Sequence, residues 1–404
     1  MLASIIIQIA LFGKYLTNDV ISALHPSFGD AKEYNDTVLE YIRTGSFTDT
    51  FKSGWRLPGY PYFIFVCYKI AAVVNIQPLV FVRLVQLLLL STIPVFAYKA
   101  TFNFTASIKK SGTAAVIFVG YIPFYYFFPM IGGESAGLFL MGLFFLAVSK
   151  LFILKNYYRQ LAIIAVIIAV STYFKPNHIL IAFPVFCILL YKFIIEKKEY
   201  INWLKHSFYF GFIIIILIMP WSIFVSNQNK MLIPLATTSG PDMVIGTGIQ
   251  INGMDKEGNS LTFKFEKKHN LAADSVFLHQ KDSLSIAQKN ALYQKEAIAI
   301  WKKRPLITIE YGFVKILHAF GFGFRGVKDY FSLCIFLLGM GSLLSKKFRK
   351  QNRNIIIISL SLLAVFCLQT FVYFGDMRLR ILMMDFSFLM LIAICIANFT
   401  DEKK

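Results

Sequence analysis

Long apolar runs separated by short polar connectors dominate the chain. Runs such as LVQLLLLSTIPVFAY, LFLMGLFFLAVSKLF, FGFIIIILIM and IIIISLSLLAVFCL approach the roughly 20 residues that a helix needs to cross a bilayer. Spans are expected at residues 2–24, 79–99, 113–130, 134–154, 161–175, 177–195, 207–225, 330–345, 355–374 and 382–399. The pattern predicts an all-α polytopic membrane protein with about ten spans, forming a single transmembrane domain over residues 1–404.

The polar connectors predict how these spans are oriented. Lys and Arg cluster after Tyr98, Ser149, Tyr191 and Ser345, and the positive-inside rule places these connectors in the cytoplasm. Both termini are then cytoplasmic. Two long segments, residues 25–78 and 226–329, form outer loops. Within these loops, the apolar stretches 60–75 and 306–322 are predicted to lie along the outer membrane surface, because counting either as a crossing would reverse every later basic cluster.

Composition excludes several classes of protein. A chain of 404 residues that is 57% hydrophobic and 16% charged is not a typical soluble domain. The net charge of +19 does not indicate a nucleic-acid partner, because the basic residues are spread over short loops. The five cysteines lie in apolar stretches without CxxC spacing, and the histidines are scattered. We therefore expect no metal site and no cofactor.

The segment GDAKEYNDTVLEYIRTG, residues 29–45, places acids in a chain that otherwise has few. Residues 31–44 have the period of a helix, which Gly45 ends, and Asp30 and Glu33 share one polar stripe. Two interpretations remain open. The two acids form a capping box on an interfacial helix, or Asp30 carries chemistry.

A second polar motif follows in FKSGWRLPGYPYFIF, residues 51–65. The Pro58–Gly59 turn holds the cation of Arg56 between aromatic residues that suit the headgroup level of a bilayer. This segment is either an aromatic anchor with an incidental arginine or the cationic half of a site shared with Asp30.

These motifs carry a family resemblance. Asp30 followed by Tyr34 after the first span, and then GWRLPGYP, resemble the polyprenyl-phosphate-sugar-dependent membrane glycosyltransferases of the GT-C superfamily, in the protein mannosyltransferase and aminoarabinose transferase branch. Looser similarities follow along the chain in GGESAGLF, YFKPNHIL, IMPWSIFVSNQNKMLIPLATTSGPDMVIGTG, LYQKEAIAIWKKRPLITIEYGFVKIL and GDMRLRILMMDF. The founding mannosyltransferases have adjacent Asp and Glu in the first outer loop, whereas Ala31 follows Asp30 here.

The resemblance implies a GT-C-type helical bundle at a bacterial-type inner membrane, with its active site on the periplasmic side. The expected reaction moves a sugar, with inversion, from a polyprenyl-phosphate donor to a hydroxyl of a lipid or glycan acceptor. Asp30 is the expected general base, and no divalent metal is required. The predicted substrate-binding residues are Glu33, Tyr34, Arg56, Tyr60, Glu134, Lys175, Arg378 and Arg380.

Simpler roles compete for several of these residues. The cations Arg56, Lys175, Arg378 and Arg380 suit a lipid phosphate, but each is also explained by snorkelling to the interface. Glu134 is explained by the helix dipole.

Two other functions also fit the pattern. One is an O-antigen polymerase or ligase that uses lipid diphosphate donors. The other is a transporter in which Arg83, Gln86 and Lys175 mark a polar pathway.

Overall fold

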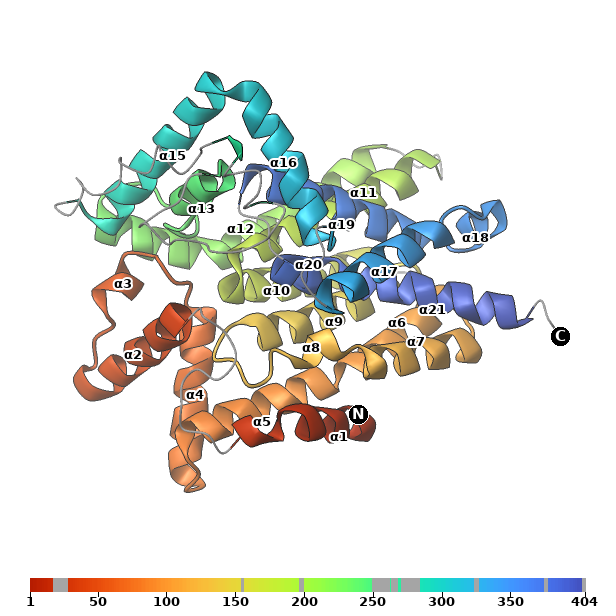
Figure 1. Cartoon of the computed structure of the whole chain (residues 1–404), viewed down its shortest axis with the longest axis horizontal. Coiled ribbons are helices and arrows are strands. Elements are labelled where there is room, and N and C mark those ends of the chain that lie inside the picture. The colour runs from red at the N-terminus through yellow and green to blue at the C-terminus, as the bar shows by residue number, and fades with distance from the viewer. Residues whose placement is uncertain are drawn as a thin grey trace.

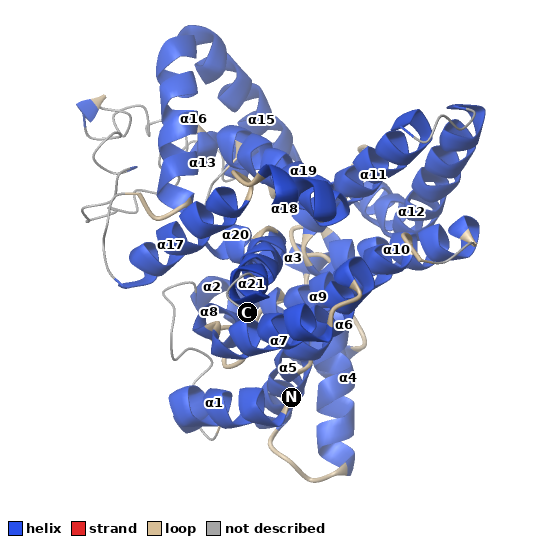
Figure 2. Ribbon diagram, turned by 90° about the vertical axis from the view of Figure 1, so that its right-hand side faces the viewer, coloured by secondary structure: helices blue, strands red, loops and turns tan. Residues whose placement is uncertain are grey.

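The computed structural model describes residues 1–16, 28–153, 156–195, 200–248, 284–322, 327–373 and 377–401, with the single positions 262, 268 and 269. Within these ranges all regular secondary structure is helical (Figures 1 and 2). Four helical stretches are long and apolar enough to cross a membrane: Pro78–Thr105, Tyr157–Phe174, Leu204–Asn229 and Arg353–Val372. Shorter apolar helices accompany them, and the chain is a helical membrane protein.

The helices follow one another as α1 (Leu2–Phe12), η1 (Gly13–Tyr15), α2 (Phe28–Thr44), α3 (Asp49–Lys52), α4 (Gly59–Val73), α5 (Pro78–Ser91), α6 (Ile93–Thr105), α7 (Ile108–Gly120), α8 (Ile122–Tyr125), α9 (Glu134–Lys150), α10 (Tyr157–Phe174), η2 (Pro176–Ile181), α11 (Ala182–Ile195), α12 (Tyr200–Asn229), α13 (Ser239–Gly246), α15 (Ile286–Lys303), α16 (Pro305–Ala319), α17 (Val327–Ser342), α18 (Lys346–Gln351), α19 (Arg353–Val372), α20 (Met377–Met383) and α21 (Asp385–Asp401).

Helix α12 shows most clearly that the fold needs a bilayer. Only 28% of its most apolar window is buried inside the protein. Large apolar side chains such as Phe208, Phe212, Ile215 and Ile223 are exposed along it. A contiguous apolar face of this length is stable where lipid covers it.

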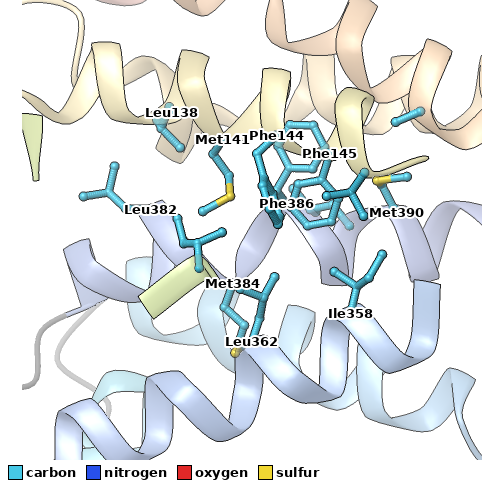
Figure 3. Packing of buried hydrophobic residues seen from close by; sticks show 14 of the residues in the cluster. Leu138, Met141, Phe144, Phe145, Ile358, Leu362, Leu382, Met384, Phe386 and Met390 are labelled. Carbon is cyan, nitrogen blue, oxygen red and sulfur yellow. The ribbon is translucent and has the colours of Figure 1, made fainter. Parts of the chain in front are cut away.

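The core joins the C-terminal helix to helices of the first half of the chain. Phe145 of α9 stacks on Phe386 of α21 at 4.6 Å between ring centroids, and the ring of Phe118 of α7 lies edge-on to Phe386 at the same distance. Ile358 and Leu362 of α19 are buried in the same cluster, which Figure 3 shows between the ribbons of these helices. The C-terminal helix α21 is therefore a central element of the fold.

The expected spans match the helices best where the apolar runs are uninterrupted, and they fail where a break separates two helices. The span predicted at 113–130 is wrong at its end, because α7 stops at Gly120 and only the short helix α8 follows before α9. Pro123 and Pro129 lie in this segment, and proline lacks the amide that a continuing helix needs. The span predicted at 382–399 is divided at Met384 between α20 and α21. The later part of the first predicted span, 17–24, lies outside the described residues.

The two predicted outer loops lie against each other. The amide of Thr237 donates to the carbonyl of Gly54 at 3.0 Å, and the amide side chain of Asn229 donates to the carbonyl of Ser53 at 3.3 Å. Gly54 has φ +80°, and a Cβ there would lie 2.5 Å from a methyl of Val225, so the turn requires glycine. This contact brings the motif around Arg56 close to α13.

Candidate functional site

Arg56 joins the two acids of α2. Its Nη2 donates to Oδ1 of Asp30 at 2.5 Å and its Nε donates to Oε2 of Glu33 at 2.7 Å. The capping-box prediction is wrong, because α2 begins two residues before Asp30 and both carboxylates bond to Arg56. The Asp30 and Glu33 side chains are 40% and 38% exposed, whereas that of Arg56 is 17% exposed. The acids are therefore accessible and the cation is fixed behind them.

Aromatic rings hold the Arg56 guanidinium from its sides. It lies 5.3 Å from the centroid of the Tyr34 ring and 5.9 Å from that of Trp55. Tyr34 in turn packs edge-to-face on Tyr60 at 4.9 Å. Burial alone would lower the pKa of Arg56, but Tyr34, Asp30 and Glu33 raise it above its usual value. Burial raises the pKa of Tyr34 to about 12, so its hydroxyl stays neutral.

A second charged group forms where α9 begins and α10 ends. Nζ of Lys175 lies 2.6 Å from Oε1 of Glu134, and Nη1 of Arg378 lies 3.4 Å from the same oxygen. Pro176 follows Lys175, which is extended at φ −142° and ends α10. The Glu134 side chain is 4% exposed, but those of Lys175 and Arg378 are 15% and 26% exposed. Glu134 is therefore the buried counter-ion that lets two largely buried cations approach each other.

Close backbone packing connects the two charged groups. A Cβ on Gly59, the first residue of α4, would lie 2.6 Å from the carbonyl oxygen of Tyr173 near the end of α10. A Cβ on Gly133 would lie 2.9 Å from the carbonyl oxygen of Phe174. The charge of Asp30 also acts on Lys175. The acidic group of α2 and the cations beside α9 thus belong to one site.

Asp242 of α13 adds an acid that the sequence interpretation missed. Its half-buried carboxyl interacts electrostatically with Arg56, Asp30 and Arg378. Burial raises the pKa of Asp242 to about 6 against the opposing effect of Arg56. A signal was present, since Asp242 is the single acid in the stretch ATTSGPDMVIGTG of the second outer loop.

Arg380 does not join this site in the structure. Its guanidinium pairs with Asp385, at 2.9 Å from Nε to Oδ1 and 3.0 Å from Nη2 to Oδ2. Tyr121 donates to the same carboxylate at 2.5 Å, and both members of the ion pair are buried. The sequence could have indicated this pair, because an acid in an apolar segment needs a partner and Asp385 follows Arg380 by five residues.

The residues of the transporter alternative are tied to backbone groups. Arg83 Nη1 donates to the carbonyl of Tyr15 at 2.7 Å, and Gln86 Nε2 donates to the carbonyls of Phe128 and Met130 at 2.6 and 2.8 Å. Both side chains are fully buried. Lys175, the third residue, belongs to the charged site. These contacts give Arg83 and Gln86 a structural role next to that site.

The fold and the site define a helical membrane protein with a partly exposed cluster of acids and cations beside the two predicted outer loops. No protein-family model matches the chain, and comparisons with curated proteins and with solved structures found no match. Across the part of the chain that the structure describes, no group of three or more His, Cys, Asp or Glu residues is arranged to hold a metal ion.

Proposed function

We propose that the protein is an inverting glycosyltransferase that moves a sugar from a polyprenyl-phosphate donor to a hydroxyl of a lipid or glycan acceptor. The site would lie at the periplasmic face of a bacterial-type inner membrane, within a GT-C-type bundle of about ten spans. One observation supports this most directly. The partly exposed carboxylate of Asp30 is held by Arg56, and α4 packs closely against the end of α10 that precedes Lys175, so that an acid and several cations lie in one region.

In the proposed reaction the acceptor oxygen attacks the anomeric carbon as the bond from that carbon to the phosphate oxygen breaks. Asp30 takes the proton of the acceptor hydroxyl, and polyprenyl phosphate leaves with the bonding electrons. General-base assistance of this kind is worth roughly 10²- to 10⁴-fold in rate. Arg56 orients the Asp30 carboxylate through Oδ1.

The leaving phosphate gains negative charge as the bond breaks, and Lys175 and Arg378 are suited to receive it. These two cations share the single carboxylate of Glu134, so this group of three carries a net charge of +1. Arginine binds phosphate oxygens in a fork, whereas lysine provides a point charge. Their contribution grows in the transition state, which is the requirement for electrostatic catalysis.

Replacement of Asp30 tests the proposed base. Asp30→Asn keeps the shape of the side chain but cannot accept the proton, so transfer should fall by at least about 10²-fold. The measurement is mass spectrometry of lipid-linked and envelope glycans from a strain that lacks the protein and carries either the wild type or the variant. The matched control is Asp36→Asn, since Asp36 lies on the same helix with an exposed side chain.

Wild-type glycans in the Asp30→Asn strain would contradict the assignment of the base. If that variant kept its activity while Arg378→Gln lost it, the lipid-diphosphate alternative would be favoured. A deletion strain whose glycans are unchanged would overturn the proposed function as a whole.

A further inference from the structure

Gln86 of α5 has every hydrogen-bonding group of its side-chain amide engaged beneath the charged site. Its Oε1 accepts from the hydroxyl of Tyr60 at 2.7 Å. Its Nε2 donates to the carbonyls of Phe128 and Met130, at 2.6 and 2.8 Å. These three bonds connect α5, the first turn of α4 and the irregular segment between α8 and α9 (Figure 1).

The irregular segment needs such an anchor because its backbone groups are not paired in a helix. The segment runs from Tyr126 to Gly133 and ends where Glu134 begins α9. Ser135 holds it from the other end, donating its hydroxyl to the carbonyl of Phe127 at 2.9 Å. Buried carbonyls without partners are costly, so Gln86 stabilises one conformation of the segment over others.

The conformation that Gln86 selects determines where the cations lie. The segment also lies against Glu134, because a Cβ on Gly132 would collide with Oε2 of that residue. A Cβ on Gly133 would meet the Phe174 carbonyl at 2.9 Å and Cε of Lys175 at 3.4 Å, so the segment lies directly against the end of α10. A shift of this backbone would move Glu134, and with it the shared contact of Lys175 and Arg378.

We propose that Gln86 is a positioning residue that sets the geometry of the Glu134–Lys175–Arg378 cation site by fixing the segment 126–133. The inference rests on the proposed function, since it assigns these cations to the donor phosphate. Only an uncharged amide supplies one acceptor and two donors at this place. Gln86→Met keeps the length of the side chain and loses all three bonds. In Gln86→Glu one carboxylate oxygen can still accept from Tyr60. The other oxygen faces the carbonyls of Phe128 and Met130 and cannot donate to them.

The matched control is Gln160→Met. Gln160 lies near the opposite end of α10 from Lys175, is also buried, and donates to the carbonyl of Ala147 at 2.6 Å. This substitution removes a buried amide of the same size at a distance from the site. It therefore measures the general cost of losing a buried glutamine.

Two measurements on the full-length, detergent-solubilised protein test the proposal. The first is hydrogen exchange of peptides covering residues 126–135. The second is the affinity for farnesyl phosphate, used as a short polyprenyl monophosphate. We expect both Gln86 variants to exchange faster in this segment and to bind the probe about tenfold to a hundredfold more weakly, as a misplaced binding group does. Gln160→Met should leave both quantities within about twofold of the wild type, as expected for a change distant from the site.

Unchanged exchange in the Gln86 variants would overturn the proposal. Faster exchange with unchanged probe affinity would overturn it as well, because the order of the segment would then not affect the cations. Should the wild type itself not bind the probe, the phosphate assignment fails, and the exchange of residues 126–135 alone decides whether Gln86 positions Glu134.

Discussion

Individual charges in this site are paired so that its two ends differ in sign. Asp30 and Glu33 with Arg56 carry two negative charges and one positive charge, a net −1. Glu134 with Lys175 and Arg378 carries a net +1. Surrounding negative charge favours a carboxylate that takes up a proton, and surrounding positive charge stabilises a phosphate that gains negative charge. The proposed base therefore suits the negative end of the site, and the departing phosphate suits the positive end. Side-chain pairing thus gives the site a direction, with the acids of α2 at one end and the cations beside α9 at the other.

Asp242 gives a pH-dependent contribution to stability that is specific to this site. Its pKa is raised from 3.8 to about 6 in the folded protein, so between these values the folded state binds more protons than the unfolded state, and stability falls as pH rises. The loss is at most about 3 kcal/mol, from roughly 1.4 kcal/mol for each pKa unit. Asp242→Asn should remove this decline, which thermal unfolding in detergent between pH 4 and pH 7 would measure. An equal decline in the variant would show that other groups cause it.

Sequence motifs identified charged residues of the site better than they identified the partners of those residues. The motifs containing Asp30 and Arg56 indicated an acid and a cation near the same surface, and the structure pairs them directly. Arg380 looked equivalent to Arg378, because two arginines two positions apart share one motif. Only tertiary packing separates them, since Arg380 meets Asp385 inside the bundle while Arg378 meets Glu134. Asp242 was missed because nothing local in α13 indicates which helix it faces.

Helices α13 and α16, which lie in the predicted second outer loop, are held to α19 by a buried lysine. Nζ of Lys315 on α16 donates to three carbonyls, those of Gly246 at 2.7 Å, Phe371 at 3.0 Å and Tyr373 at 2.8 Å. These acceptors lie at the C-terminal ends of α13 and α19, where helix carbonyls lack intrahelical partners and the dipole favours a cation. Gly312 allows this packing, because a Cβ there would lie 2.5 Å from the Phe371 ring.

Loss of the Lys315 ammonium should loosen this junction. Lys315→Met keeps the apolar part of the side chain but leaves buried carbonyls without a donor, at a cost of about 1–3 kcal/mol for each unsatisfied group. We expect a lower unfolding temperature in detergent and faster protease cleavage around α13 and α15. Lys302→Met is the control, because Lys302 is exposed at the end of α15. Equal stability of the two variants would contradict the role given to Lys315.

The sequence predicted elements well where hydrophobic periodicity was strong or a glycine marked the end of a helix. The acidic helix expected over 31–44 is α2, followed by Gly45 at φ +71°, which suits the end of a helix. Predictions failed where backbone carbonyls accept hydrogen bonds from a side chain of a distant helix and not from amides of their own helix. Gln86 donates such bonds to the segment after α8. A local pattern cannot identify a hydrogen-bond partner more than forty residues away, so the irregular segment was interpreted as the end of a span.

At the scale of the whole molecule, the proposed site requires both outer loops on one side of the membrane and the basic connectors on the other. The contact between Gly54 and Thr237 already places parts of both loops together. Cysteines introduced singly at exposed positions can test the remaining prediction: Asp49→Cys in α3, Lys295→Cys in α15 and Lys350→Cys in α18. The parent chain, with its five free cysteines, gives the background labelling.

A membrane-impermeant maleimide should label the Asp49→Cys and Lys295→Cys variants in intact cells. It should reach the Lys350→Cys variant only after permeabilisation, because the basic cluster around α18 is retained on the cytoplasmic side. Labelling of all three variants in intact cells would contradict the predicted orientation. Labelling of the α3 and α15 positions from opposite sides would be more serious, because it would contradict the contact between Gly54 and Thr237. Asp30 and Asp242 could then not serve one substrate.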